Sequence, residues 1–138
     1  MDVTRDQKNK KLWLSQEKYV ERVLEKFNMK NAKPASTPLT AHFKLSEWDC
    51  PQLKEEKLQM SKIPHAFAVG SLMCGMVHTR LDIAHAVGVV SRFVSNLRKA
   101  HWEVVKWIMR YLRRTTELCL YFDGFEPILE DYTDSDMI

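Results

Sequence analysis

The chain has 138 residues, which allows one ordinary domain, and 45% of them are apolar, enough for a modest core. Its 21 basic and 18 acidic residues give a formal charge of only +3, so a nucleic-acid surface would require local clustering of basic residues. Three cysteines without paired spacing argue against a secreted disulfide framework. There is no signal-peptide core and no run of about 20 apolar residues, so we expect an intracellular protein outside the membrane.

Residues 1–31 predict a β-hairpin followed by an amphipathic helix. Asp6 to Asn9 make a polar turn, and Ser15 is a suitable N-cap for a helix that extends to about Met29. Apolar side chains recur on one face of that helix, at Tyr19, Val20, Val23, Leu24 and Phe27.

Residues 32–63 have a different composition, because prolines interrupt them and Pro64 follows. Proline removes a backbone donor and disfavours helix in the residue before it. We therefore predict an extended connector with one short helix near residues 54–59, and we expect the surface that it contacts to lie elsewhere.

Helical periodicity resumes at Pro64 and predicts helices over 64–77, 82–95 and 100–115. Two strands, 119–122 and 128–133, then predict a second hairpin around an Asp123-Gly124 turn. The fold class expected is α+β and mostly helical.

Basic residues gather on one side of the last predicted helix. Lys106, Arg110 and Arg113 are spaced i, i+4, i+7, and the flanking basic residues are Arg98, Lys99 and Arg114. This side either follows the phosphates of a nucleic acid or is an ordinary solvated face whose aliphatic stems cover apolar surface.

Aromatic and metal-binding residue types allow further functional readings. The aromatic residues Trp13, Trp102, Trp107 and Tyr111 are possible base-stacking platforms. Most of them follow the spacing of the apolar residues, however, which favours packing in the core or against a partner. Cys74 and His78 have the i, i+4 spacing of a metal site, but core packing is the simpler interpretation.

The carboxylates Asp134 and Asp136 would share one face of a strand. They are the sharpest catalytic candidates in the sequence. The alternative is that they are two exposed acids on a poorly ordered terminus.

Several sequence motifs occur in a fixed order: Lys11 to Tyr19, Asn28 to Leu39, Val69-Gly-Ser-Leu-Met73, Thr79-Arg-Leu-Asp-Ile-Ala84, His101 to Leu112, and Tyr132-Thr-Asp-Ser-Asp136. Together they resemble the Pol polyprotein of copia-type retrotransposons. The matching region lies downstream of the reverse transcriptase active site and runs into ribonuclease H.

The resemblance implies four parts. Residues 1–31 would end the polymerase palm, 32–63 would be a Pro-rich connector, 64–117 a thumb- or connection-like helical region, and 118–138 the start of a ribonuclease H-like domain. It further implies that Asp134 is the first metal-binding aspartate of ribonuclease H, and that Trp13 lies near the primer. The implied partners are an RNA/DNA template–primer duplex and the remaining palm and ribonuclease H parts of the polyprotein.

The family's aromatic-x-Asp-Asp polymerase motif is absent, since the sequence contains no Asp-Asp pair. Two-metal phosphoryl transfer needs carboxylates that hold ions roughly 3.5–4 Å apart. We therefore expect no cofactor for this chain alone, and magnesium only for the parent enzyme.

Departures from the family pattern occur at Leu81, Leu97, Arg98, Arg114 and Asp131, where the family has turn-forming proline or glycine. If Arg114 or Asp131 must adopt positive φ, each would be strained. These changes predict a diverged copy, truncated at both ends.

The leading hypothesis is a non-catalytic fragment of reverse transcriptase that keeps some affinity for the template–primer backbone. Its helices should expose apolar area where the palm and ribonuclease H would dock. Two alternatives remain at this point: the middle of an active Pol enzyme with polymerase and ribonuclease H activity, or a domesticated helical protein-interaction module.

Overall fold

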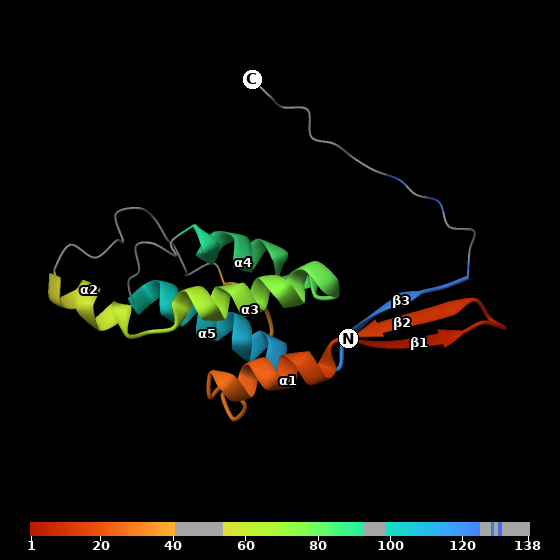
Figure 1. Cartoon of the computed structure of the whole chain (residues 1–138), viewed down its shortest axis with the longest axis horizontal. Helices are drawn as coiled ribbons and strands as arrows, with labels where there is room; N and C mark the ends of the chain where they lie inside the picture. Colours follow the sequence, from red (N-terminus) through yellow and green to blue (C-terminus); the bar gives the residue numbers. More distant parts are fainter. Residues whose placement is uncertain (41–53, 93–98, 125–127, 129, 131–138) are drawn as a thin grey trace, which may run out of the picture.

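A computed structural model of the chain describes residues 1–40, 54–92, 99–124, 128 and 130. A small antiparallel sheet lies beside a body of helices (Figure 1). The sheet has the strand order β1-β2-β3 and consists of β1 (Asp2–Asp6), β2 (Lys11–Ser15) and β3 (Cys119–Phe122). The α+β, mostly helical fold class is confirmed.

The predicted N-terminal hairpin is confirmed, and the side chain of Asp6 organises its turn. One carboxylate oxygen accepts the backbone N–H groups of Lys8 and Asn9, and the other accepts the Asn9 amide at 2.8 Å. The hydrogen bonds from Asn9 hold the pKa of Asp6 below its usual value. Lys10 completes the turn at φ 53°.

Helix α1 (Glu17–Lys26) confirms the predicted amphipathic helix and buries Val20, Val23 and Leu24. The N-cap prediction was off by one residue, because Gln16 takes the cap position. Ser15 still contributes, since its hydroxyl accepts the Glu17 N–H. Gln16 is buried instead, with its amide oxygen accepting the Thr79 hydroxyl.

The helical body contains α2 (Lys54–Ser61), α3 (His65–His78), the 3₁₀ turn η2 (Leu81–Ile83), α4 (Ala84–Ser91) and α5 (Lys99–Arg114). One apolar core joins α1, α3, α4 and α5. Helix α5 contributes most to it, because four successive inward positions are fully buried, at Val104, Val105, Ile108 and Met109. Burying such side chains stabilises the fold by roughly 1.5–3 kcal/mol each.

The boundaries of the three predicted helices agree closely with α3, α4 and α5. The second of them opens with η2 as a separate 3₁₀ turn, and its predicted end at residues 93–95 lies outside the described residues. The short helix predicted near residues 54–59 is α2.

The predicted strand 119–122 is confirmed as β3, whereas its predicted pairing with residues 128–133 is not tested. The partner that the structure gives β3 is β2, in the register Trp13 opposite Tyr121 and Leu14 opposite Leu120. A strand that follows α5 thus returns to the N-terminal hairpin. Most of the predicted partner strand, residues 129 and 131–133, lies outside the described residues.

The condition for strain at Arg114, a positive φ, is not met. Arg114 is the last residue of α5, and among the described non-glycine residues positive φ occurs at Lys10 and Asn28. Leu81 opens η2 without strain and is 63% exposed. Leu97, Arg98 and Asp131 lie outside the described residues. Among the helices that the structure describes, none is long and apolar enough to cross a membrane.

Candidate nucleic-acid interface

The basic side of α5 is confirmed as one side of a helix, but two of its members already have partners. Lys106 makes an ion pair of 2.7 Å with Glu103 one turn earlier. The Nε–H of Arg110 donates to the Lys33 carbonyl at 2.6 Å, and its guanidinium lies 4.6 Å from the centre of the Trp107 ring. Arg110 therefore has a structural role, because it contacts both the connector and a neighbouring side chain of α5.

Arg110 helps to hold residues 33–37 of the connector against α5. The Ala35 N–H donates to the Arg110 carbonyl at 3.2 Å, and the Trp107 indole N–H donates to the Thr37 carbonyl at 2.8 Å. Ala35 itself is buried. The prediction that the connector contacts a surface elsewhere was wrong for residues 33–37, and Trp107 anchors this segment rather than presenting a free stacking face.

Replacing Arg110 by Ala should loosen this segment. We expect the Ala35 amide to exchange with deuterium about five- to tenfold faster, because one hydrogen bond contributes about 1 kcal/mol. Amide exchange followed by NMR measures this. Arg114→Ala is the matched control and should leave the rate unchanged, since Arg114 lies on the exposed end of the same helix. An unaltered Ala35 rate in the Arg110 variant would contradict the anchoring role.

The ends of α5 retain basic charge without a described structural role. Lys99 and Arg114 are exposed and Arg113 is half-buried. Within the described residues their side chains make no hydrogen bond or ion pair. Arg98, Asp134 and Asp136 lie outside the described residues, so their predicted roles stay predictions.

The other aromatic candidates divide between sheet and core. Trp13 is half-buried on the sheet, with its ring centre 5.3 Å from that of Tyr121. Trp102 packs against the apolar core. The Tyr111 hydroxyl donates to Asp82 at 2.7 Å. All four aromatic side chains are half-buried, and the predicted contact of Trp13 with nucleic acid stays a prediction.

A buried arginine, which the sequence interpretation did not single out, ties the turn after α3 to the end of α5. Arg80 is 2% exposed and donates from Nε and Nη2 to the two carboxylate oxygens of Asp82, at 3.0 and 2.8 Å. It also donates to the carbonyl and hydroxyl of Thr115, at 2.9 and 2.6 Å. We call these residues, with Tyr111, the arginine clamp.

The electrostatics of the clamp favour a charged carboxylate. Partial burial raises the pKa of Asp82, but the hydrogen bonds from Arg80 and Tyr111 outweigh it and hold the pKa below its usual value. Burial, and then the bond to Asp82, raises the pKa of Tyr111. The Arg-x-Asp spacing at residues 80–82 indicates that the two side chains could pair, but the spacing does not show that the arginine is buried.

Two histidines lie inside the helical body at the beginnings of α3 and α5. His65 and His101 are both fully buried, and neither ring nitrogen of His65 has a partner among the described residues. Burial, together with repulsion from His101, lowers the pKa of His65 to about 4. His65 is therefore neutral near pH 7.

Core packing was the wrong interpretation for Cys74 and His78. Both are exposed, and Nδ1 of His78 lies 2.7 Å from the Cys74 carbonyl oxygen. Across the part of the chain that the structure describes, no three His, Cys, Asp or Glu side chains form a group that could hold a metal ion.

The sequence is similar to those of known transposon proteins. The chain is 65% identical over 137 residues, 99% of its length, to the "Retrovirus-related Pol polyprotein from transposon TNT 1-94" of Nicotiana tabacum. It is 32% identical over 126 residues to the "Retrovirus-related Pol polyprotein from transposon RE1" of Arabidopsis thaliana. It is 30% identical over 128 residues to the "Putative transposon Ty5-1 protein YCL074W" of Saccharomyces cerevisiae.

The chain spans only a part of each of these relatives: 10% of the tobacco protein, 8% of the RE1 protein and 40% of the yeast protein. No protein-family model matches the chain. No solved structure matches it either.

Proposed function

This chain is a relative of copia-type retrotransposon Pol polyproteins over almost its whole length, and we propose that it forms the part of a reverse transcriptase that joins the polymerase to ribonuclease H. Its proposed activity is contact with the backbone of a template–primer duplex. The chain does not carry out the polymerase chemistry, because the sequence has no Asp-Asp pair. The described residues contain no group of three His, Cys, Asp or Glu side chains that could hold the magnesium ions of the parent enzyme.

The observation that supports the proposal is the row of basic residues along α5. Lys99, Lys106, Arg110 and Arg113 follow one another on the same side at helical spacing. The Lys106–Glu103 pair is partly exposed and an exposed pair contributes about 1 kcal/mol or less, so it can exchange for a phosphate. Lysine and arginine on a regular helix suit contact with phosphates, which carries no sequence information.

Removing charge at the end of α5 should weaken duplex binding in a salt-dependent way. For the double variant Arg113→Ala/Arg114→Ala, we expect the slope of log affinity against log salt to flatten by about 2, since each lost phosphate contact removes about 0.9. The affinity of the chain for an RNA–DNA duplex, measured by fluorescence anisotropy at several salt concentrations, tests this. These two arginines are chosen because the described fold does not depend on them.

The matched control removes the same charge elsewhere. Lys57 and Lys62 are exposed on and after α2, so they belong to a different element from the basic residues of α5. The variant Lys57→Ala/Lys62→Ala should keep the slope of the unmodified chain. A slope that is unchanged in the arginine variant, or flattened equally in both, would rule out α5 as the duplex contact.

A further inference from the structure

The register of the sheet collects its apolar side chains on one face. Val3, Leu14 and Leu120 form one cross-strand row, and Arg5, Leu12 and Phe122 form another on the same side of the pleat. These six residues are called the apolar sheet face. The opposite face carries the row Thr4, Trp13 and Tyr121.

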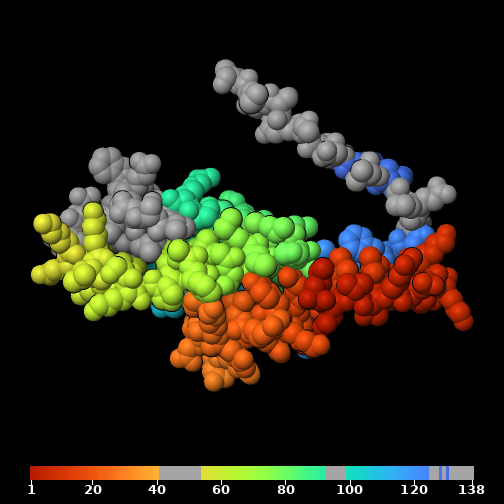
Figure 2. All heavy atoms as spheres, viewed as in Figure 1, coloured from red at the N-terminus to blue at the C-terminus, as the bar shows by residue number. Residues whose placement is uncertain are grey.

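The described helices do not bury the apolar sheet face. No residue of the three strands is buried, and Val3 and Phe122 are 60% and 50% exposed. The sheet extends to one side of the helical body (Figure 2). A three-stranded sheet normally needs one covered apolar face for stability, so this face is unusually open.

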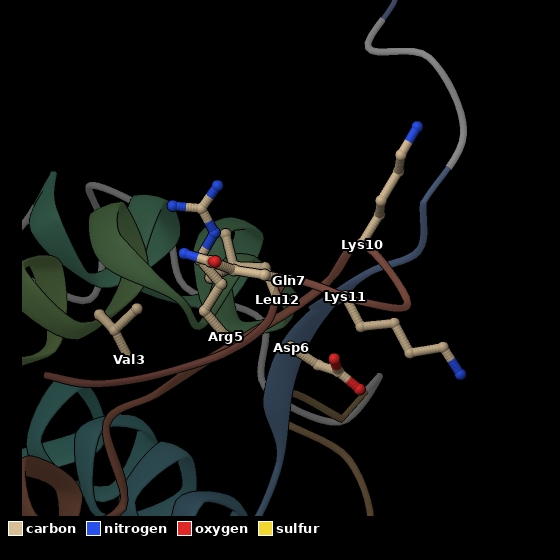
Figure 3. A pocket seen from close by; sticks show the side chains of 7 residues that line it. All are labelled: Val3, Arg5, Asp6, Gln7, Lys10, Lys11 and Leu12. Atoms are coloured by element: carbon tan, nitrogen blue, oxygen red, sulfur yellow. The ribbon is translucent and has the colours of Figure 1, made fainter.

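The face is hollowed near the hairpin. Val3, Arg5 and Leu12 point to the same side of the strands there (Figure 3). They line a groove of about 440 Å³ together with Asp6, Gln7, Lys10 and Lys11. Its lining therefore combines two apolar side chains with three basic side chains and one acidic side chain.

We propose that the apolar sheet face docks another segment of a Pol polyprotein, and that this segment covers the face with apolar side chains and places a carboxylate opposite Arg5. In the tobacco relative, nine-tenths of the protein lies outside the matched region, so such segments are joined to it in one polypeptide. Covalent linkage gives them a high effective concentration. The proposal does not depend on the duplex contact assigned to α5.

Arg5 distinguishes this occupant from a second copy of the chain. Arg5 is paired opposite Leu12 in the strand register, and its side chain makes no hydrogen bond or ion pair among the described residues. Two copies packed face to face would enclose two such cations against apolar groups or against each other. An unpaired buried charge costs several kcal/mol, whereas a carboxylate on the partner would satisfy it.

The test uses the 138-residue chain and, as separate probes, the polypeptides that precede and follow the matched region in the tobacco Pol polyprotein. Titration calorimetry should show association with one of them. Leu12→Asp and Arg5→Glu should each weaken it by about tenfold or more. Thr4→Asp places a new charge on the opposite face and should change the affinity by less than about twofold.

Arg5→Glu keeps the test decisive if Leu12→Asp perturbs the sheet, because Arg5 is exposed. Absence of association with both probes would overturn the proposal, and so would association that Arg5→Glu does not weaken. Ultracentrifugation decides the remaining case: a dimer of the chain that Leu12→Asp dissociates would assign the face to a second copy. Loss of duplex binding by the same variants would assign it to nucleic acid.

Discussion

Replacing Arg80 by Ala is expected to lower the free energy of unfolding by about 3 kcal/mol or more. The variant removes four donated hydrogen bonds and leaves a cavity where a nearly fully buried side chain was packed. Asp82 then keeps only the bond from Tyr111 within the clamp. Urea unfolding followed by circular dichroism measures the loss as a lower midpoint.

Two comparisons separate the clamp from a general effect of lost charge. Arg113→Ala removes the same charge from a half-buried position and should shift the unfolding free energy by less than about 0.5 kcal/mol. Arg80→Lys keeps the charge but not the forked geometry, so it should fall between the two. Equal stability of the Arg80 and Arg113 variants would show that the clamp contributes nothing.

The stability of the chain should decline as the pH falls from about 6.5 towards 4, and His65 should account for a large share of the decline. Its pKa in the folded chain, about 4, lies below the ordinary 6.5 of an unfolded histidine. The unfolded state therefore binds the proton first, and acid favours unfolding. The contribution is fully present above pH 6.5 and is lost through this window, at up to about 1.4 kcal/mol per pH unit, or about 3 kcal/mol by pH 4.

The variant His65→Phe removes the titrating group and fills the buried site with an apolar ring. We expect it to flatten the dependence of the unfolding free energy on pH between 6.5 and 4, measured by urea unfolding at half-unit intervals. His85→Phe is the matched control, because His85 is exposed. In this variant the unfolding free energy should change with pH as steeply as in the unmodified chain. If His65→Phe keeps the full slope, another group is responsible.

Local sequence patterns predicted the elements of this protein well. The positions of α1, α3 and α5 follow from apolar residues repeating at helical spacing, and the first hairpin follows from the polar turn around Asp6. These signals lie within a dozen or so residues of one another, so neighbouring side chains alone decide them. The N-cap was predicted one residue too early. Gln16 takes the cap position, and its amide oxygen accepts a hydrogen bond from Thr79, 63 residues away in sequence.

The candidate site was predicted in part, and its errors share a cause. The spacing of Lys106, Arg110 and Arg113 correctly indicated one side of a helix, but no periodicity could show that residues 33–37 lie along that helix and use Arg110 and Trp107. The same holds for Arg80, which no local pattern marked as buried. Long-range packing placed it in the interior beside Thr115.

The sequence by itself determined the kinship with copia-type Pol polyproteins, the helices, the first hairpin and the absence of the Asp-Asp motif, because these depend on residue identity and short-range spacing. Only the tertiary structure decided that β3 pairs with β2, that the connector rests on α5, and that Arg80 and His65 are buried. Each of these joins segments far apart in the chain. Such contacts form because the whole chain must bury its apolar residues, pair its buried donors and align its strands at the same time. No pattern within a short stretch of sequence predicts them.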